Sequence, residues 1–452
     1  MTAEVQIFRS ERVITPDGEM PATVHVSGGR IEQVAGYDEF PAGAEPVDLG
    51  SLAMLPGFVD SHVHINEPGR TDWEGFATAT RAAAGGGVTT LVDMPLNSVP
   101  PTTTVAALQA KLAAAESLTV DVAFWGGVVP GNASEIPALL EAGASGFKCF
   151  LVPSGADEFE HVSIAEAENA MGVLAPRGAP LLVHAEDPAA LARNEPAGAD
   201  GPDRSDCRAF ERSRPPEVEL EAIRAVLAAA ERTGARVHIV HVSTAEGLAA
   251  IREARGRGAH VSGETCPHYL WFASEEVPRG GTQWKCAPPI RGSANRQRLR
   301  DALRGGLVDM IVSDHSPSPP EGKETGGDFF RAWGGIASLQ IAPLVTWTVA
   351  AAEQCTLSQL CTWMSAAPAA LAGLDHRKGS IAPGRDADLV AFDPDAEVQV
   401  QAGQLQHRHK LTPYDGAVLR GRVHRTWLRG EIVHDEGSFP ATLRGRPLLR
   451  GQ

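Results

Sequence analysis

The stretch LPGFVDSHVHI, residues 55–65, predicts the fold, because it is a short apolar run that ends in two histidines and is followed by a helical pattern. The chain repeats this order of a β-rich run and an Ala/Glu/Arg-rich segment, and eight such units are the number that closes a (β/α)₈ barrel. We therefore predict an α/β fold with a TIM barrel. The other seven runs are TTLVDMP (89–95), DVAFWGG (121–127), GFKCFL (146–151), PLLVHAE (180–186), RVHIVHVS (236–243), HVSGETCPH (260–268) and DMIVSDH (309–315).

Both ends of the chain have a different pattern. Residues 1–53 and 380–452 contain short alternating runs separated by Gly-rich reversals, which is typical of antiparallel strands. Each segment is too small to close a core of its own, so we predict that the two combine into one small β-sandwich. The predicted organisation is a barrel of residues 54–379 with a sandwich built from the N- and C-terminal segments.

Particular residues predict where two helices begin or end, and two segments are predicted to be long loops. Thr244 is placed to cap one helix, and another is predicted to open at Pro216 and close at Gly234. Two charged, Gly/Pro-rich segments, residues 187–214 and 316–333, are too long for ordinary barrel loops. Because both follow the carboxyl ends of predicted strands, we expect them to carry substrate contacts or lids.

Composition excludes several function classes. Forty Lys and Arg against 56 Asp and Glu give a net charge of −16, which disfavours nucleic acid and anionic membranes as partners. No apolar run approaches the roughly 18 residues of a membrane helix, and the N-terminus lacks the order of a signal peptide. The six cysteines form no CxxC pair, so we expect reduced core thiols in a cytoplasmic protein.

Reactive side chains collect at the carboxyl ends of the predicted strands, where a barrel builds its active site. His62 and His64 are two residues apart, so both face one side of a strand and form half of a metal site. Taken alone, they could equally be two unrelated histidines. Further candidates stand at equivalent strand ends, namely Lys148, His184, His241 and Asp314.

Strand alternation separates candidates from their neighbours. His238 and His241 are three residues apart, so only one can point inward, and we choose His241 because it is nearer the strand end. The same argument selects Asp314 over its neighbour His315. His268 is interpreted as a capped loop histidine more readily than as a ligand. Asp60 lies one layer deeper in the predicted barrel than His62 and His64, where it suits support of the metal site or packing better than catalysis.

Lys148 is unusual, because Phe147 and Phe150 flank it within a buried strand. Burial drives a lysine toward its neutral amine, which can react with carbon dioxide to give a carbamate suited to bridging two divalent metals. The alternative is a buried salt bridge to a carboxylate at a strand end, such as Glu186.

Several motifs together resemble the cyclic-amidohydrolase branch of the amidohydrolase superfamily, which contains dihydroorotases, hydantoinases and allantoinases. These motifs are GFVDSHVHINEPGRTDWEGF (57–76), SGFKCFL (145–151), HIVHVSTAEG (238–247), ETCPHYL (264–270), KCAPPIR (285–291) and VSDHSPSPPE (312–321). The resemblance implies a homotetrameric hydrolase with two divalent metals per chain, first of all Zn, with Co, Mn or Fe as alternatives. It also implies that Lys148 is an N6-carboxylysine formed with CO₂. The implied metal ligands are His62, His64, Lys148, His184, His241 and Asp314.

Two positions separate the members of this branch. Dihydroorotases typically have an Arg where this chain has Asn66, and hydantoinases typically have a Tyr that residues 149–161 lack. The segments 67–76, 332–340 and 410–423 also resemble allantoinases. The resemblance thus implies opening of the hydantoin ring of allantoin to allantoate, in purine and ureide catabolism, with Asp314 as the catalytic proton carrier. A hydantoinase or dihydropyrimidinase acting on other cyclic ureides, and a non-catalytic dihydroorotase-like protein, are the alternatives.

A small ureide substrate needs donors and acceptors that backbone and amide groups can supply. Arg70 could reach the site or pin its loop. The candidate substrate contacts are Asn97, Ala287, Ser316, Gly334 and Gly335.

Overall fold

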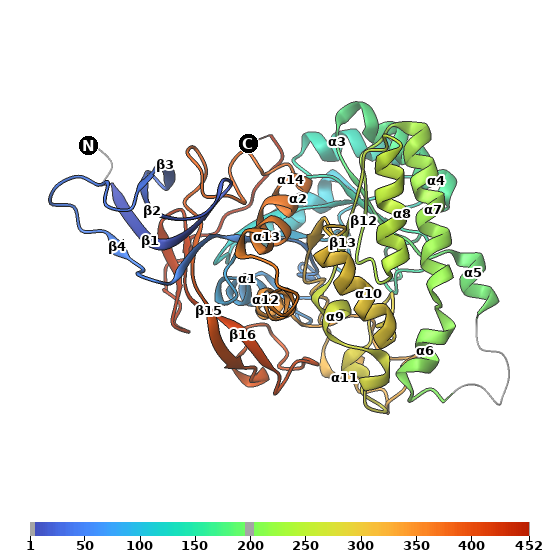
Figure 1. The fold of residues 1–452 in the computed structure, drawn as a ribbon. Coiled ribbons are helices and arrows are strands. Elements are labelled where there is room, and N and C mark those ends of the chain that lie inside the picture. The colour runs from blue at the N-terminus through green and yellow to red at the C-terminus, as the bar shows by residue number, and fades with distance from the viewer. Residues whose placement is uncertain (1–4, 195–202, 452) are drawn as a thin grey trace.

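The computed structural model describes residues 5–194 and 203–451, and its centre is a barrel of parallel strands (Figure 1). Trp125 separates two pieces of the third strand, and a parallel bridge between Val63 and His315 joins the last strand to the first. Each of the eight predicted runs contains a strand, so the predicted fold class is confirmed. The barrel strands are β6 Phe58–Val63, β7 Val88–Asp93, β8 Asp121–Phe124 with β9 Gly126–Gly127, β10 Phe147–Phe150, β11 Leu181–His184, β12 Val237–Ile239, β13 Val261–Thr265 and β14 Met310–Ile311.

Helices follow the strands and cover the outside of the barrel. Figure 1 shows α4, α7 and α8 side by side, and α7 packs against both of the others. The longer helices are α1 Phe76–Gly85, α2 Val105–Ala114, α4 Ile164–Leu174, α7 Pro216–Thr233, α8 Ala245–Gly256, α10 Ser293–Arg304 and α12 Ala342–Ala352. The shorter ones are α3 Ile136–Glu141, α5 Pro188–Arg193, α6 Cys207–Ser213, α9 Pro267–Trp271, α11 Pro320–Lys323, α13 Leu357–Cys361 and α14 Ala367–Leu371.

The chain ends meet in one sheet system, as predicted. Its strands run in the order β17-β16-β15-β5-β1-β2-β3, with β4 beside β1, so β5 joins the N-terminal to the C-terminal strands. Phe8 and Trp427, from opposite ends of the chain, pack edge to face in its core with ring centroids 5.4 Å apart. The strands are β1 Gln6–Thr15, β2 Gly18–Ser27, β3 Arg30–Gly36, β4 Val47–Asp48, β5 Ala53–Pro56, β15 Leu389–Gln399, β16 Val418–Leu428 and β17 Glu431–Asp435.

The predicted helix ends are confirmed. The Thr244 side chain accepts a hydrogen bond of 3.2 Å from Gly247 N and caps α8. Helix α7 begins at Pro216 and ends at Gly234, whose φ of 67° is the left-handed conformation that glycine adopts without steric penalty.

The two long segments are more structured than predicted. Residues 187–214 contain α5 and α6, while residues 195–202, the Gly/Pro-rich centre of that segment, lie outside the described residues. Residues 316–333 contain α11. Short helices were missed because a single turn or two gives too few residues to show a helical period.

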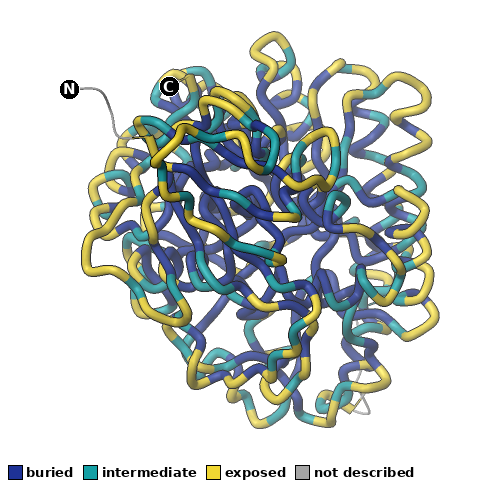
Figure 2. The backbone as a smooth tube through the Cα atoms, turned by 60° about the vertical axis from the view of Figure 1, so that its left-hand side comes forward, coloured by how far each residue is buried: buried dark blue, intermediate teal, exposed yellow. Residues whose placement is uncertain are grey.

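Lysines are unusually buried in this chain (Figure 2 shows the distribution of burial). Of the 40 Lys and Arg residues only six are lysines, and five of the six are buried. Surface positive charge is therefore carried mainly by arginine. The buried lysines are Lys111, Lys148, Lys285, Lys323 and Lys378, and Lys410 is exposed.

Lys378 connects the barrel to the sandwich. Its Nζ lies 2.7 Å from a carboxylate oxygen of Asp121 on β8, 3.0 Å from Asp386 and 2.6 Å from Asp388, just before β15. These charges raise the pKa of Lys378 to about 12 although burial alone lowers it. A charged amine thus lies among three buried carboxylates at the domain junction.

The cysteines and helices agree with the compositional expectations. All six cysteines are buried and free, as expected for core thiols. Within residues 5–194 and 203–451, no helix combines the length and apolar character needed to cross a bilayer.

Candidate metal centre

His62, His64 and Asp314 form one half of the centre, at the carboxyl end of the barrel. Their ligand atoms all lie within 4.8 Å of one another. Asp314 Oδ1 is 3.2 Å from His62 Nε2 and 3.7 Å from His64 Nε2. Two imidazole nitrogens and a carboxylate oxygen at this spacing are a ligand set that a divalent metal such as zinc accepts.

His184 and His241 form the other half. His184 Nδ1 lies 3.0 Å from His241 Nε2, so these two nitrogens converge on one point. The rings of His62 and His241 have centroids 5.4 Å apart, which places the two halves side by side. The structure therefore brings all the predicted imidazoles into one cluster.

Lys148 on β10 is fully buried beside both halves. Its Nζ has no hydrogen-bond partner among the described residues and lies 4.5 Å from the centroid of the Phe150 ring. Burial lowers the pKa of Lys148 to about 8, against a smaller opposing effect of Asp314. Glu186 is bonded elsewhere, so the alternative interpretation of Lys148 as its salt-bridge partner is wrong.

Two of these residues reach the cluster by a route that strand alternation does not describe. Strand β12 ends at Ile239 and β14 at Ile311, and His241 and Asp314 have positive φ values of 38° and 46°. Such φ values are strained for non-glycine residues and persist where surrounding structure enforces them. The two residues lie in the cluster, but the period-two argument used to choose them does not apply beyond the strands.

The two neighbouring histidines that strand alternation excluded, His238 and His315, show the same limit of that argument. His238 also lies toward the site, where its Nε2 is 3.0 Å from Glu264 Oε2. The prediction that His238 faces away from the site is therefore wrong. His315 pairs with Glu74 at 3.1 Å, outside the cluster. Asp60 accepts hydrogen bonds from the backbone of His62 and Ser313 and so ties β6 to the chain after β14, which is the supporting position expected for it.

Glu264 on β13 is a functional residue that the sequence reasoning missed. One carboxylate oxygen binds His62 Nδ1 and the other binds His238 Nε2, so Glu264 fixes the ring that presents Nε2 to Asp314. Burial alone would raise the pKa of Glu264, but His62 and His238 outweigh it and the pKa is lowered. A glutamate within a predicted strand, level with the other reactive residues, was the available signal.

The side chains present fit a pair of divalent metals. Burial, followed by the charges of neighbouring groups, lowers the pKa values of His64 and His241 well below the usual range, which favours the neutral, metal-binding imidazole. An unpartnered buried amine at Lys148 is compatible with a modification that supplies oxygen ligands. Nitrogen and oxygen donors of this kind accept several divalent metals.

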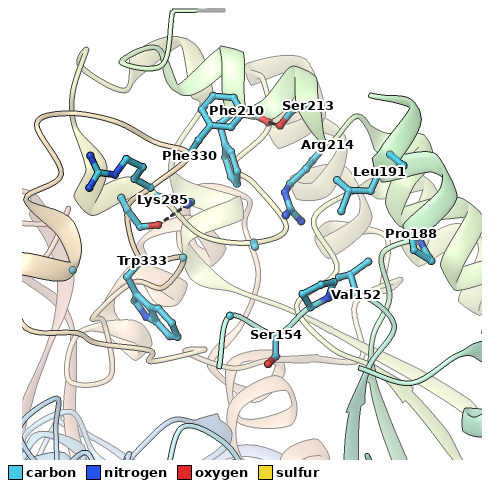
Figure 3. Close-up of a pocket in the computed structure, with 18 of the residues that line it drawn as sticks. Val152, Ser154, Pro188, Leu191, Phe210, Ser213, Arg214, Lys285, Phe330 and Trp333 are labelled. Atoms are coloured by element: carbon cyan, nitrogen blue, oxygen red, sulfur yellow. Dashed lines mark hydrogen bonds between the residues drawn. The ribbon is translucent and has the colours of Figure 1, made fainter. Parts of the chain in front are cut away.

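Two neighbouring cavities share part of their lining, and the smaller one contains the cluster. The smaller, of about 80 Å³, is lined by the metal-site residues. The larger, of about 660 Å³, forms a vestibule beside it, and Figure 3 shows the side chains that line this vestibule. Trp73, Phe210, Phe330 and Trp333 supply aromatic walls to the vestibule. The residues that line both are Pro153, Ser154, Arg214, Ala287, Trp333 and Gly334.

The predicted substrate contacts divide into two groups. Asn97, Ala287, Ser316 and Gly334 all line the smaller cavity. Gly335 does not, because it packs against the backbone of Ser316 with no space for a Cβ. Gly335 therefore shapes the loop instead of facing the cavity.

Nearby side chains hold the loops around the cavity. Arg70 donates to Asn97 O at 2.7 Å and pairs with Glu158, so it pins its loop. Asn66 Oδ1 accepts a 3.0 Å hydrogen bond from Asn97 Nδ2.

His268 lies in α9, buried and without a hydrogen-bond partner in the described chain, and so is not the capped loop histidine that was predicted.

The chain is similar to known proteins over nearly its whole length. An allantoinase of Streptomyces avermitilis is 48% identical over 98% of both chains, and an allantoinase of Arabidopsis thaliana is 43% identical over 96% of this chain and 89% of that one. Among solved structures, an L-hydantoinase (dihydropyrimidinase) of Arthrobacter aurescens has a TM-score of 0.93 and 32% identity over 100% of both chains. The model of the amidohydrolase family matches residues 53–433, and the chain belongs to that family.

Proposed function

We propose that this protein is an allantoinase, which opens the hydantoin ring of allantoin by hydrolysis to give allantoate. The observation that carries the proposal is the convergence of four histidines, Asp314 and the unpartnered Lys148 amine on one small cavity. The similarity to allantoinases across nearly the whole chain supports this choice of substrate. Retention of the complete ligand set argues against the non-catalytic alternative.

We also propose that Lys148 carries a carboxyl group. Its neutral Nζ attacks CO₂, a new N–C bond forms and one proton leaves, so the product is a carbamate with two oxygen atoms. The buried position and lowered pKa of Lys148 support this step, since only the neutral amine reacts. The carbamate, the four histidines and Asp314 would hold two divalent ions, with zinc first and cobalt, manganese or iron as alternatives.

When bound, the metal ions would lower the pKa of the attacking water and polarise the ring carbonyl. The protein supplies the remaining chemistry. Asp314 accepts the proton from the water at a carboxylate oxygen and returns it to the leaving ring nitrogen. Before any metal binds, burial raises the pKa of Asp314, although His62 and Lys148 oppose the rise. Glu264 keeps His62 in place throughout.

A hydantoinase or dihydropyrimidinase acting on other cyclic ureides is the second candidate. The large vestibule with aromatic walls favours it, because bulky apolar ring substituents would fit there. The TM-score of 0.93 with an L-hydantoinase agrees.

A substrate panel tests the proposal. Purified protein, with metal content measured in each preparation, is assayed on allantoin, dihydroorotate and hydantoins with alkyl or aryl substituents. We expect allantoin to have the highest kcat/KM, with dihydroorotate far lower. Preference for alkyl or aryl hydantoins would replace the proposal by the second candidate, and metal-replete protein inactive on all of them would overturn both.

Further properties belong to the same proposal. We propose a cytoplasmic homotetramer whose partner is the ureide alone, supported by the family resemblance and, against nucleic acid and membranes, by the net charge of −16. We propose a division into a barrel of residues 54–379 and a sandwich of residues 1–53 and 380–452, supported by the sheet that joins both ends.

A further inference from the structure

Glu186 and Arg214 form a polar pair next to the metal centre that the proposed mechanism does not use. A single oxygen, Glu186 Oε2, lies 2.7 Å from His184 Nε2 and 2.6 Å from Arg214 Nη1. The other oxygen, Oε1, is buried and has no hydrogen-bond partner among the described residues. A buried acceptor without a donor is energetically unfavourable, so a ligand with an N–H group would find a partner there.

Arg214 lies where the two cavities meet. It lines both of them, and Figure 3 shows its side chain extending into the pocket above Val152 and Ser154. Its side chain is 22% exposed, so the guanidinium keeps N–H donors free beyond the one that binds Glu186. Glu186 Oε2 links Arg214 to His184, so Arg214 is positioned to meet a substituent that extends from a ring at the metal centre into the vestibule.

The pair offers an acceptor and a donor next to each other. A urea or amide group complements it, because an N–H would donate to Glu186 Oε1 while the carbonyl oxygen accepts from Arg214. A carboxylate tail would meet the charge of Glu186, and an alkyl tail would leave both groups unpaired. The chemistry of the pair therefore selects a ureido or carboxamide substituent.

We propose that Glu186 and Arg214 bind the ring substituent, and that Arg214 is a specificity-determining residue for a ureido or carboxamide tail. This deepens the proposed function and rests on it for the identity of the natural substrate. It gives a reason for a ureido-hydantoin to be preferred in a vestibule whose walls would otherwise admit apolar groups.

The test is a ratio measured within one enzyme preparation. For the wild type and Arg214→Gln, kcat/KM is determined on allantoin and on unsubstituted hydantoin, so that changes in metal content or folding cancel. Arg214→Gln should lower the allantoin-to-hydantoin ratio about ten- to a hundred-fold, the value of one charge-assisted hydrogen bond. Arg214→Lys, which keeps the charge but not the fork of donors, should give an intermediate loss.

Arg331→Gln is the matched control, because Arg331 is an exposed cation that also lines the vestibule. It removes the same charge away from Glu186 and should leave the ratio within about two-fold, since a screened surface charge contributes little. Equal losses on both substrates in Arg214→Gln would overturn the inference and make Arg214 a support for His184 alone. An equally large change of the ratio in Arg331→Gln would also overturn it.

A second pair of substrates separates this inference from the proposed function. Hydantoins with 2-carbamoylethyl and 2-carboxyethyl tails differ only in the group at the end of the tail, which is an amide in the first and a carboxylic acid in the second. The wild type should prefer the amide, and Arg214→Gln should lose most of that preference. If the wild type does not hydrolyse allantoin, the proposed function is contradicted, while this pair of hydantoins still tests Arg214. If the wild type prefers the hydantoin with the carboxylic acid tail, the inference is overturned.

Discussion

Lys148 gives the most direct test of the proposed metal centre, because its buried amine has no hydrogen-bond partner among the described residues and lies beside both groups of candidate ligands. Lys148→Ala should lose metal and activity together. Short carboxylic acids such as acetate or propionate should restore part of both, because they can place two oxygens in the vacated space. Metal analysis and turnover, with and without the acid, measure this.

The matched measurement is the mass of the intact wild-type protein under native conditions. We expect an addition equal to one CO₂, which disappears in Lys148→Ala. A fully active, metal-replete wild type with an unmodified lysine would contradict the carboxylation.

Asp314 has two separable roles, as a ligand and as a proton carrier. An amide oxygen can still coordinate a metal but cannot accept the proton, so Asp314→Asn should remain slow even at saturating metal. The expected loss in kcat is about 10²–10⁴-fold, the usual contribution of a general acid–base group. Rate and metal content of the same sample decide the outcome, and near wild-type turnover of a metal-replete variant would leave Asp314 as a ligand only.

At the residue scale, the sequence predicted which side chains meet but not the backbone that brings them together. The positive φ values at His241 and Asp314 arise from packing around the ends of β12 and β14, which no local pattern encodes. Glu264 was missed because a contact between β13 and β6 joins residues that are far apart in the chain.

At the scale of elements, Lys323 at the end of α11 holds the walls of the vestibule. Its Nζ donates to the backbone carbonyls of Thr282, Lys285 and Trp333 at 3.3, 2.9 and 2.8 Å. One amine thus fixes two segments, residues 282–285 and the loop at Trp333, and Lys285 and Trp333 both line the vestibule.

Lys323→Met should therefore weaken substrate binding without affecting the metal ligands. We expect KM to rise roughly three- to ten-fold, as for one net hydrogen bond, with unchanged metal content. Steady-state kinetics beside metal analysis check this. A fall in kcat at constant KM would show that Lys323 acts on the chemical step instead.

The elements themselves were largely predictable. Eight apolar runs and the caps at Thr244 and Gly234 are local signals, and each corresponds to an element end or strand in the structure. Helices α5, α6 and α11 were not predicted, because such short helices depend on contacts with the rest of the molecule more than on their own sequence.

At the scale of the whole molecule, Lys378 holds the barrel and the sandwich together. Replacing it with Met would leave Asp388 buried without its ion-pair partner, whereas Asp121 keeps Arg429 and Asp386 keeps Arg377. Removing one partner from a buried ion pair is destabilising by about 3–5 kcal/mol, so Lys378→Met should lower the free energy of unfolding by that order. Urea unfolding followed by circular dichroism measures the change.

Arg224→Met is the control for this prediction, since Arg224 is an exposed cation on α7. A surface substitution should change the free energy of unfolding by no more than about 0.5 kcal/mol. Equal stability of the two variants would mean that the junction does not depend on Lys378.

The burial of five of the six lysines has a practical consequence for handling the protein. Reagents that acylate amines in water need an accessible, unprotonated amine, and among the described side chains Lys410 alone offers a lysine at the surface. Within the described part of the chain, coupling to an amine-reactive support or dye should therefore join at Lys410. Immobilised protein would be held in few orientations, and the lysines around the reaction site would keep their chemistry.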